Sequence, residues 1–164
     1  MLDRIARRLP RFLRLDHRVY QEIAGDERAT AEAALIALAA AVLAGLAGFS
    51  LFRGLRTEFL VRLATGVLVN WLLWSLVARV VGAAAYHSVA SWAAVARVLG
   101  YAVAPLALGL FGAIPGLLAW ALSLFYGFHA VREVMGLRTE AAAVTIGASS
   151  LIVLLINVAV QVLL

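Results

Sequence analysis

The sequence has 164 residues, of which 65% are hydrophobic and 14% are charged, and its formal net charge is +5. The mean hydropathy is +0.99. Soluble domains are about 45–50% apolar and about 25% charged, and small ones bury only about two-thirds of the surface that their unfolded chains expose. The composition therefore excludes a water-soluble globular fold and predicts an all-α polytopic membrane protein.

Two further properties exclude whole classes of site. The chain has no cysteine, which excludes disulfides, thiolate metal sites and catalytic thiols. A pI near 10.7 would suit nucleic acid, but half of the arginines lie in the first 28 residues and the others flank apolar runs. Orientation in the membrane and anionic headgroups explain basic flanks better. The predicted partners therefore include membrane lipids and exclude nucleic acid.

The first 29 residues are predicted to form a cytoplasmic amphipathic segment ahead of a membrane domain at 30–164. Apolar residues from Leu2 to Ile23 recur at helical spacing with arginines between them, and Pro10 is expected to interrupt the helix. A basic amphipathic helix lies in the headgroup plane; the alternative is a helix packed on the protein's own loops. The arginines expected at the membrane surface are Arg4, Arg7, Arg8, Arg11 and Arg14.

Five apolar runs are predicted to span the membrane, since a spanning helix needs about 20 residues. These runs lie at 31–52, 60–82, 98–113, 116–134 and 141–164. The mixed stretch 83–96 is predicted to be an interfacial elbow with Tyr86 and Trp92 at headgroup depth. Pro105 should break the helix of the third run, and residues 112–116 are predicted to form a tight turn.

The arginines predict how the chain is oriented. If the N-terminus is cytoplasmic, eleven arginines flank the spans on that side, and three (Arg53, Arg56 and Arg62) lie outside. The positive-inside rule therefore predicts an inner-membrane protein with a cytoplasmic N-terminus. The three outer arginines are the exception, and they would form a cytoplasmic cluster if the first two spans were a hairpin inserted from the opposite face.

The second half of the chain carries a recognisable pattern. The stretch 97–105 (RVLGYAVAP) is followed by a Gly/Pro turn, by Trp120, and by Gly127 near the end of the fourth run. A polar turn at 136–141 (GLRTEA) leads into the fifth run, and 19–30 (VYQEIAGDERAT) leads into the first. In these features the chain resembles the Yip family of Ypt/Rab-interacting membrane proteins, in its bacterial branch.

The resemblance implies five spans, a cytoplasmic N-terminus and a short outward C-terminus. Eukaryotic members are linked to Rab GTPases and to vesicle traffic between early secretory compartments. Where those members have a long cytoplasmic N-terminal domain, this sequence has residues 1–29. Bacterial members have no settled biochemical activity, so the resemblance implies a membrane architecture and no particular reaction.

Polar side chains inside the apolar runs are candidate sites, because they are costly in lipid. Asn70 lies deep in the second run, and Asn157 and Gln161 lie four residues apart in the fifth. These amides are expected to bond neighbouring helices, the alternative for Asn70 being to line a polar pathway. Glu32 begins the first run, where it is expected to reach water and to suit the helix dipole; proton handling is the alternative.

His129 and Glu133 lie one turn apart near the end of the fourth run. Such a pair could share a proton or supply half of a metal site, but the HExxH signature needs two histidines and no third ligand is evident. An interfacial helix-end pair is therefore the favoured interpretation. Small residues four apart allow helices to approach closely, and the candidate packing positions of this kind are Gly45, Gly48, Gly112 and Gly116.

The sequence contains no GxGxxG, P-loop, GxSxG or CxxC motif, so we expect neither an enzyme nor a cofactor. The predicted function is that of a membrane scaffold or accessory subunit, which binds a membrane-protein partner or a second copy of the chain. The alternative is a lipid- or solute-handling protein with a polar groove near Asn70 and Pro105. A metal or proton enzyme at His129 and Glu133 is a third possibility.

Overall fold

The structure is a computed structural model that describes residues 1–46 and 57–163. Every regular element in these residues is a helix. Two short helices come first, α1 (Leu2–Leu13) and α2 (His17–Gly25). They are followed by α3 (Ala29–Leu46), α4 (Thr57–Val67), the π-helix η1 (Leu68–Leu73), α5 (Trp74–Tyr86), α6 (Trp92–Ala102), the 3₁₀-helix η2 (Ala104–Phe111), α7 (Ala113–Met135) and α8 (Thr139–Leu163).

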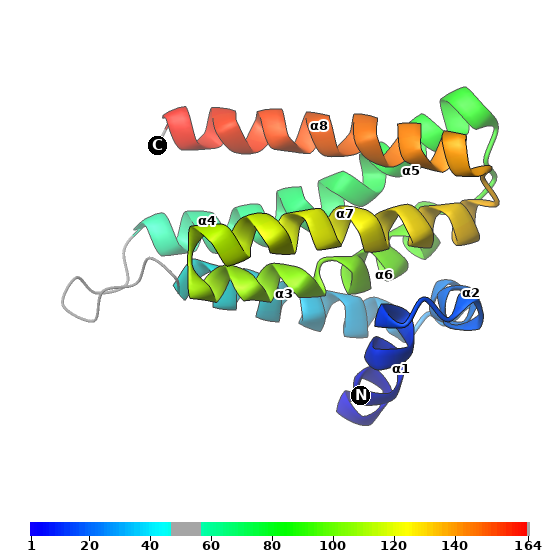
Figure 1. Ribbon diagram of the computed structural model, residues 1–164, viewed down its shortest axis with the longest axis horizontal. Helices are drawn as coiled ribbons and strands as arrows, with labels where there is room; N and C mark the ends of the chain where they lie inside the picture. Colours follow the sequence, from blue (N-terminus) through cyan, green and yellow to red (C-terminus); the bar gives the residue numbers. More distant parts are fainter. Residues whose placement is uncertain (47–56, 164) are drawn as a thin grey trace.

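Five segments of the described chain are long and apolar enough to cross a membrane, which confirms the predicted five-span helical bundle. They are 29–46, 59–86, 92–111, 113–135 and 139–160. Figure 1 shows them lying along the long axis of the molecule, with successive spans running in opposite directions. The predicted continuation of the first span to residue 52 lies outside the described residues.

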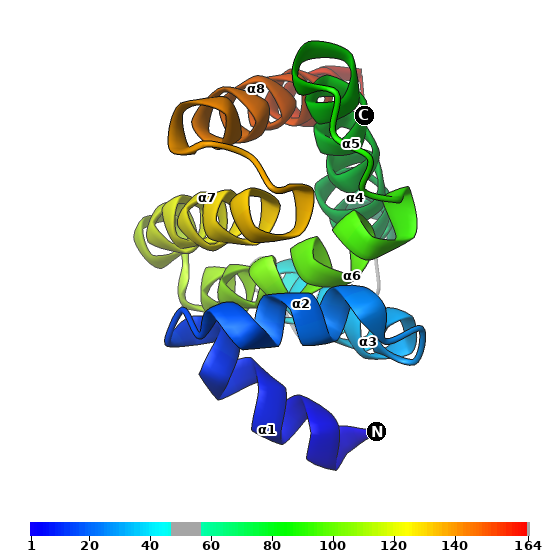
Figure 2. The same ribbon diagram turned by 90° about the vertical axis from the view of Figure 1, so that its right-hand side faces the viewer.

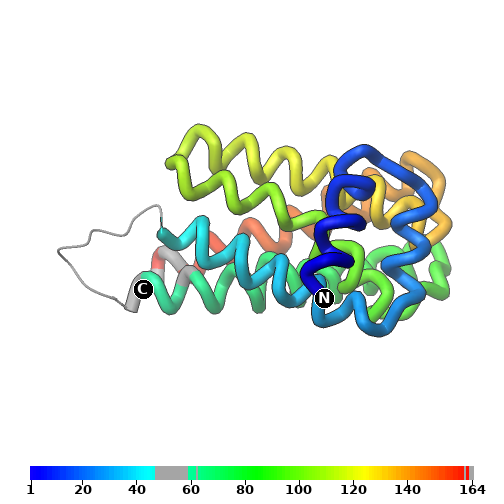
Figure 3. The backbone as a smooth tube through the Cα atoms, turned by 90° about the horizontal axis from the view of Figure 1, so that it is seen from below, coloured from blue at the N-terminus to red at the C-terminus, as the bar shows by residue number. Residues whose placement is uncertain are grey.

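The two ends of the bundle differ. The short helices α1 and α2 and the connections 87–91 and 136–138 lie at one end, while the turn at Gly112 and the C-terminus lie at the other (Figures 1 and 3). We call the first the N-terminal end of the bundle. Seen end-on in Figure 2, α2 runs across the ends of α3 and α6, whereas α1 projects sideways. This grouping of segments is the one that the arginine counts predict, and the side facing the cytoplasm stays a prediction.

The predicted elbow at 83–96 is wrong in its extent, because only residues 87–91 lie outside helices. Helix α5 continues to Tyr86 and ends at His87, whose φ of 56° gives a left-handed cap. Helix α6 begins at once after Ser91, whose hydroxyl accepts a hydrogen bond from the Ala94 amide at 3.2 Å. Alanine-rich sequence supports helix at both edges, and this explains why the spans reach further than hydropathy indicates.

The α-helix of the third span breaks near Pro105 as predicted. The helix begins at Trp92, before the predicted start at residue 98, and the span ends in a shorter turn than predicted. Helix α6 stops at Ala102, and the chain continues as the tighter η2, which has Pro105 at its start. The predicted turn at 112–116 shrinks to Gly112, with φ 108° and ψ −169°, a conformation open only to glycine. Pro115 falls in the first turn of α7, where its missing N–H leaves no bond unmade.

The N-terminal break also lies elsewhere than predicted. Helix α1 runs through Pro10 to Leu13, and the chain turns at Leu15, which has φ 60°. The carbonyl of Ala6 loses the bond that Pro10 cannot donate, but Ala6 is exposed, so water can satisfy it. Asp16 then caps α2 by accepting a hydrogen bond from the Arg18 amide at 3.0 Å.

Close packing in the bundle depends on small residues. A Cβ added to Gly100 in α6 would lie 2.9 Å from both the Ala33 Cα and the Trp71 Nε1 atoms. The Trp71 indole donates to the Ala96 carbonyl at 2.8 Å. A Cβ on Gly127 in α7 would likewise lie 2.7 Å from the Trp74 ring. Glycine at these positions therefore lets neighbouring helices and tryptophan rings pack closely against the backbone. Such close contacts hold membrane helices together where the hydrophobic effect between helices is missing.

Candidate functional site

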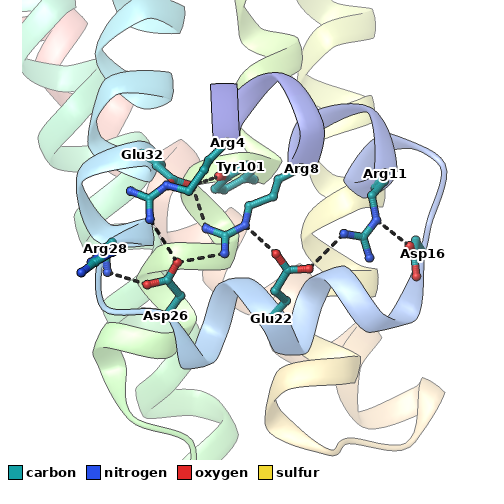
Figure 4. A network of polar contacts seen from close by, with 9 residues as sticks. All are labelled: Arg4, Arg8, Arg11, Asp16, Glu22, Asp26, Arg28, Glu32 and Tyr101. Atoms are coloured by element: carbon teal, nitrogen blue, oxygen red, sulfur yellow. Dashed lines mark hydrogen bonds and ion pairs between the residues drawn. The ribbon is translucent and has the colours of Figure 1, made fainter. Parts of the chain in front are cut away.

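A cluster of ion pairs joins the N-terminal helices to the first span (Figure 4). Arg8 on α1 is buried, and each of its three nitrogens donates to a different carboxylate. The distances are 2.8 Å to Glu22, 2.9 Å to Asp26 and 2.9 Å to Glu32. One guanidinium thus connects α1, the second half of α2, the turn that follows α2 and the start of α3, through the donor fork of arginine.

Glu32 is the deepest member of this cluster. The sequence places it where a carboxylate would reach water, but the structure buries it fully. The Arg4 Nε atom lies 2.8 Å from its Oε1 atom, Arg8 bonds its Oε2 atom, and the Tyr101 hydroxyl donates to that same Oε2. Glu32 also lies in the first turn of α3, where the helix dipole favours a negative charge. Cations, the tyrosine and the dipole together compensate the cost of burial.

A second arginine extends the cluster toward water. The Arg11 Nε donates to Asp16 at 2.9 Å, and its Nη1 donates to Glu22 at 3.0 Å. The hydrogen bonds from these arginines hold the pKa values of Asp16, Glu22 and Asp26 below their usual range. Burial lowers the pKa of Arg8, but its bonds to the carboxylates outweigh burial and leave that pKa raised. Asp16, Glu22, Asp26 and the arginines that bond them, Arg8 and Arg11, are therefore charged at neutral pH.

An aromatic core lies beneath the charges. Phe12, Tyr20 and Tyr101 are fully buried. The Phe12 ring centroid lies 4.7 Å from that of Tyr20, 5.6 Å from that of Tyr101 and 6.1 Å from that of Tyr126. Tyr20 donates to the Phe12 carbonyl at 3.2 Å, and burial raises its pKa. Helices α1 and α2 are thus packed on the bundle by apolar surface as well as by charge.

Helix α2 is also tied to the bundle at both ends. At its C-terminal end, Arg97 of α6 donates to the Ala24 carbonyl at 2.7 Å and to the Thr30 hydroxyl at 2.9 Å. At its N-terminal end, the His17 Nδ1 atom lies 3.1 Å from the Glu133 carboxylate of α7. We call α1 and α2, held in this way, the N-terminal platform.

The five arginines that were predicted to lie at the membrane surface have two kinds of surroundings in the platform. Arg4, Arg8 and Arg11 pair with carboxylates, whereas Arg7 and Arg14 are exposed. A role at the membrane surface therefore remains a prediction, and Arg7 and Arg14 are the members free of ion pairs among the described residues. The sequence did contain a partial signal for the cluster, because the arginines of α1 recur at spacings of three or four residues and Glu22 lies four residues before Asp26.

His129 and Glu133 are not paired with each other in the structure. The Glu133 carboxylate binds Arg132 at 2.8 Å and faces His17, while the His129 ring packs edge-on against Phe125 at 4.8 Å. No cluster of three or more potential metal ligands occurs among the described residues. The geometry thus places Glu133 in the attachment of α2 rather than beside His129.

Two of the predicted amides meet across helices. The Asn157 Nδ2 of α8 donates to the Asn70 Oδ1 of η1 at 2.8 Å, and also to the Val153 carbonyl at 2.8 Å. Asn70 lies in the π-helix Leu68–Leu73, and π-helical turns are rare elements that often occur at functional sites. The side chain of Gln161 lies outside the described residues.

A cavity of about 240 Å³ adjoins this amide pair. The Trp74 indole donates to the Ser150 hydroxyl at 3.1 Å in its wall, and the buried Ser123 hydroxyl has no hydrogen-bond partner among the described residues. Pro105 does not line the cavity, but Val103 and Leu106 on either side of it do. The other lining residues are Asn70, Trp120, Leu124, Val153, Leu154 and Asn157.

The candidate packing glycines have mixed surroundings. A Cβ on Gly45 would lie 3.2 Å from the Phe59 ring, and one on Gly116 would lie 3.7 Å from the Gly109 Cα atom. Gly112 has open space around it, and Gly48 lies outside the described residues. The described contacts of Gly45 and Gly116 are therefore within the chain, and a role in binding another molecule stays a prediction.

Comparison with known proteins gives one result. The family model described as the Yip1 domain matches residues 14–160, which include α2, all five spans and the cavity. No curated protein and no solved structure gave a match. The matched region begins after most of α1, so the arginines of α1 that hold the ion cluster lie ahead of it.

Proposed function

The chain belongs to the Yip1 domain family, and from that premise we propose that it is a membrane scaffold or accessory subunit that acts by binding a partner. The family and the five spans support a role in the membrane. We further propose that it resides in the inner membrane with the platform on the cytoplasmic side, since the arginine distribution favours that orientation.

The observation that carries this proposal is the fixed position of the platform. Four carboxylates, three arginines and a buried aromatic core hold two short helices against one end of the bundle. A surface that is ordered before binding loses less conformational entropy when a partner arrives. The exposed charged residues of α2 and of the turn after it are His17, Arg18, Glu22, Glu27 and Arg28.

Helix α1 is suited to contact lipid headgroups. It runs across the direction of the spans (Figures 1 and 3), and Leu2 at its start is 69% exposed. The exposed Arg7 and Arg14 lie on the same helix. An in-plane helix with apolar and basic side chains binds anionic membrane surfaces, so we propose that α1 steadies the platform on the membrane.

Purification in a gentle detergent, followed by quantitative mass spectrometry, tests the scaffold proposal. We expect a membrane-protein partner, or a second copy of the chain, in a fixed ratio. The combined substitutions Arg18→Glu and Arg28→Glu should reduce its recovery at least severalfold, because they reverse two exposed positive charges on α2 and on the turn after it. Arg138→Glu is the matched control, because Arg138 is exposed in the connection between α7 and α8, outside the platform. Unchanged recovery after the double substitution would refute the proposal.

A second candidate function has its own observation. The cavity beside the Asn70–Asn157 pair supports a lipid- or solute-handling role, since polar groups within a membrane bundle often line such paths. If this role is correct, Asn70→Leu should abolish flux of the transported molecule in liposomes. Flux equal to that of the unsubstituted protein would exclude a path through this cavity.

A further inference from the structure

The cavity joins elements that are distant in the sequence. Its walls come from η1, the start of α5, η2, the middle of α7 and the second half of α8. We infer that it binds an uncharged lipid through a single hydroxyl or carbonyl group, with the tail of the lipid leaving into the bilayer. This inference rests on the second function proposed above, for which it names the ligand.

Ser123 supplies the first argument. Ser123 is 3% exposed, and its hydroxyl has no hydrogen-bond partner among the described residues although the residue lines the cavity. A buried hydroxyl left unpaired costs about 1–3 kcal/mol. A ligand with a hydroxyl or carbonyl group in the cavity would remove that cost.

The amide pair supplies a second set of hydrogen-bonding groups. Asn157 donates to Asn70, so the Asn70 NH₂ group and the Asn157 carbonyl are not used in that bond. Both residues line the cavity together with Ser123. A ligand oxygen can therefore accept from Asn70 or Ser123, and a ligand hydroxyl can donate to Asn157.

The absence of charge decides the class of ligand. No acidic, basic or histidine side chain is among the described residues that line the cavity. Ser123 lies near the midpoint of the span 113–135, far from the ends where a headgroup meets water. A phosphate or carboxylate there would be desolvated without a counter-charge, at a cost well above that of a neutral group.

Size and access argue for a lipid rather than a small solute. The cavity is only partly enclosed, and its rim includes Trp120 and Leu154, which are 40% and 42% exposed on the outer surface of α7 and α8. By proportion to a cavity of about 150 Å³ that takes up benzene, 240 Å³ accommodates about ten non-hydrogen atoms. A polar group with a short length of chain fits inside, and the rest of the chain passes the rim into lipid.

Photolabelling of the full chain in phosphatidylcholine nanodiscs tests this assignment. The probe is a monoacylglycerol with a diazirine in its acyl chain. We expect saturable labelling of peptides from α7 and α8 that contain the cavity wall. A phosphatidylglycerol and an alkane that carry the same diazirine chain should label those peptides weakly and without saturation.

Substitutions make the test specific. Ser123→Ala should weaken saturable labelling about fivefold, as expected for the loss of one neutral hydrogen bond, and Ser123→Leu should abolish it by filling the cavity. Ser149→Ala is the matched control, because Ser149 is buried on α8, bonds the Ile146 carbonyl of its own helix and does not line the cavity. A circular-dichroism melting curve for each variant establishes that it folds.

Two results would overturn the inference: equal saturable labelling by the alkane or by phosphatidylglycerol, or labelling of folded Ser123→Ala at the level of the unsubstituted protein. The readout is binding and not transport. Saturable labelling without flux in liposomes would therefore refute the second function while leaving the lipid site intact, so the two failures are distinguishable.

Discussion

Replacing Arg8 by alanine should detach α1 from the bundle. Arg8 is buried and bonds three carboxylates on two other helices and the turn between them. The substitution removes all three bonds at once and leaves the acids facing one another. We expect local opening of α1 with the five-span bundle retained, because Arg8 contacts the first span only through Glu32 and does not bridge one span to another.

The size of the effect follows from the burial of each acid. Glu22 is exposed and Asp26 is half-buried, so water replaces the hydrogen bonds that these two acids lose at small cost. Glu32 is fully buried, and removing one partner of a buried ion pair costs about 3–5 kcal/mol. Because Arg4 and Tyr101 still contact Glu32, the lower figure of about 3 kcal/mol applies. That energy corresponds to local opening that is about a hundredfold more frequent.

Amide hydrogen exchange of the protein in nanodiscs measures this opening directly. Peptides from residues 2–13 should exchange about a hundredfold faster in Arg8→Ala, while peptides from α7 keep their rates. Arg7→Ala is the matched control, since Arg7 is an exposed arginine on the same helix. Equal exchange rates in these two variants would refute the reasoning.

A double-mutant cycle then separates the pair from its surroundings. In the cycle of Arg8→Met and Glu32→Gln, the combined loss of stability should be smaller than the sum of the two single losses. Each single substitution leaves a buried charged group with one partner fewer, whereas the double substitution removes both charges. Strict additivity would show that the 2.9 Å contact contributes no coupling.

Three further predictions concern acid, packing and the amide pair. Acidification should release the platform from about pH 4 downward. The pKa values of Glu22 and Asp26 are lowered in the folded protein, so these acids stabilise the platform at pH values above their unfolded pKa, and that contribution is lost as the pH falls. The distance between two introduced spin labels measures the release, and an unchanged distance at pH 3 would contradict the prediction. Gly100→Ala should lower the thermal midpoint through a clash costing about 1–3 kcal/mol, whereas Gly147→Ala, with open space around it, should not. Asn70→Leu should cost only about 0.6 kcal/mol of bundle stability, the average for an interhelical hydrogen bond in a membrane, and a loss several times larger in the same melting assay would contradict this.

Hydropathy predicted the spans because lipid requires the same apolar length from every helix. It failed at their ends, where capping decides. Ser91 starts a helix inside a stretch that hydropathy assigned to an elbow. The first helix runs past Pro10 to Leu13, and the chain turns at Leu15. Such boundaries depend on single hydrogen bonds and dihedral angles, which hydropathy does not measure.

The candidate site was predictable only in part. The amides Asn70 and Asn157 were expected to bond neighbouring helices, and the structure shows them bonding each other. The ion cluster was missed because basic residues at the start of a membrane protein are usually explained by headgroups, and their acidic partners lie up to 28 residues further along the chain, as in the Arg4–Glu32 pair. Ser123 carried no signal at all, since its importance comes from missing a partner in three dimensions.

The topology places the platform and the connections 87–91 and 136–138 on one face of the membrane and the turn at Gly112 on the opposite face. Because the chain has no cysteine, single cysteines at Arg7, Val89 and Ile114 can be probed with a membrane-impermeant maleimide; Val89 and Ile114 are 96% and 85% exposed. In bacterial spheroplasts with intact inner membranes, we expect only Ile114→Cys to react. Arg7→Cys and Val89→Cys should react only after the membrane is opened. Reaction of Val89→Cys and Ile114→Cys from the same side of the membrane would contradict it.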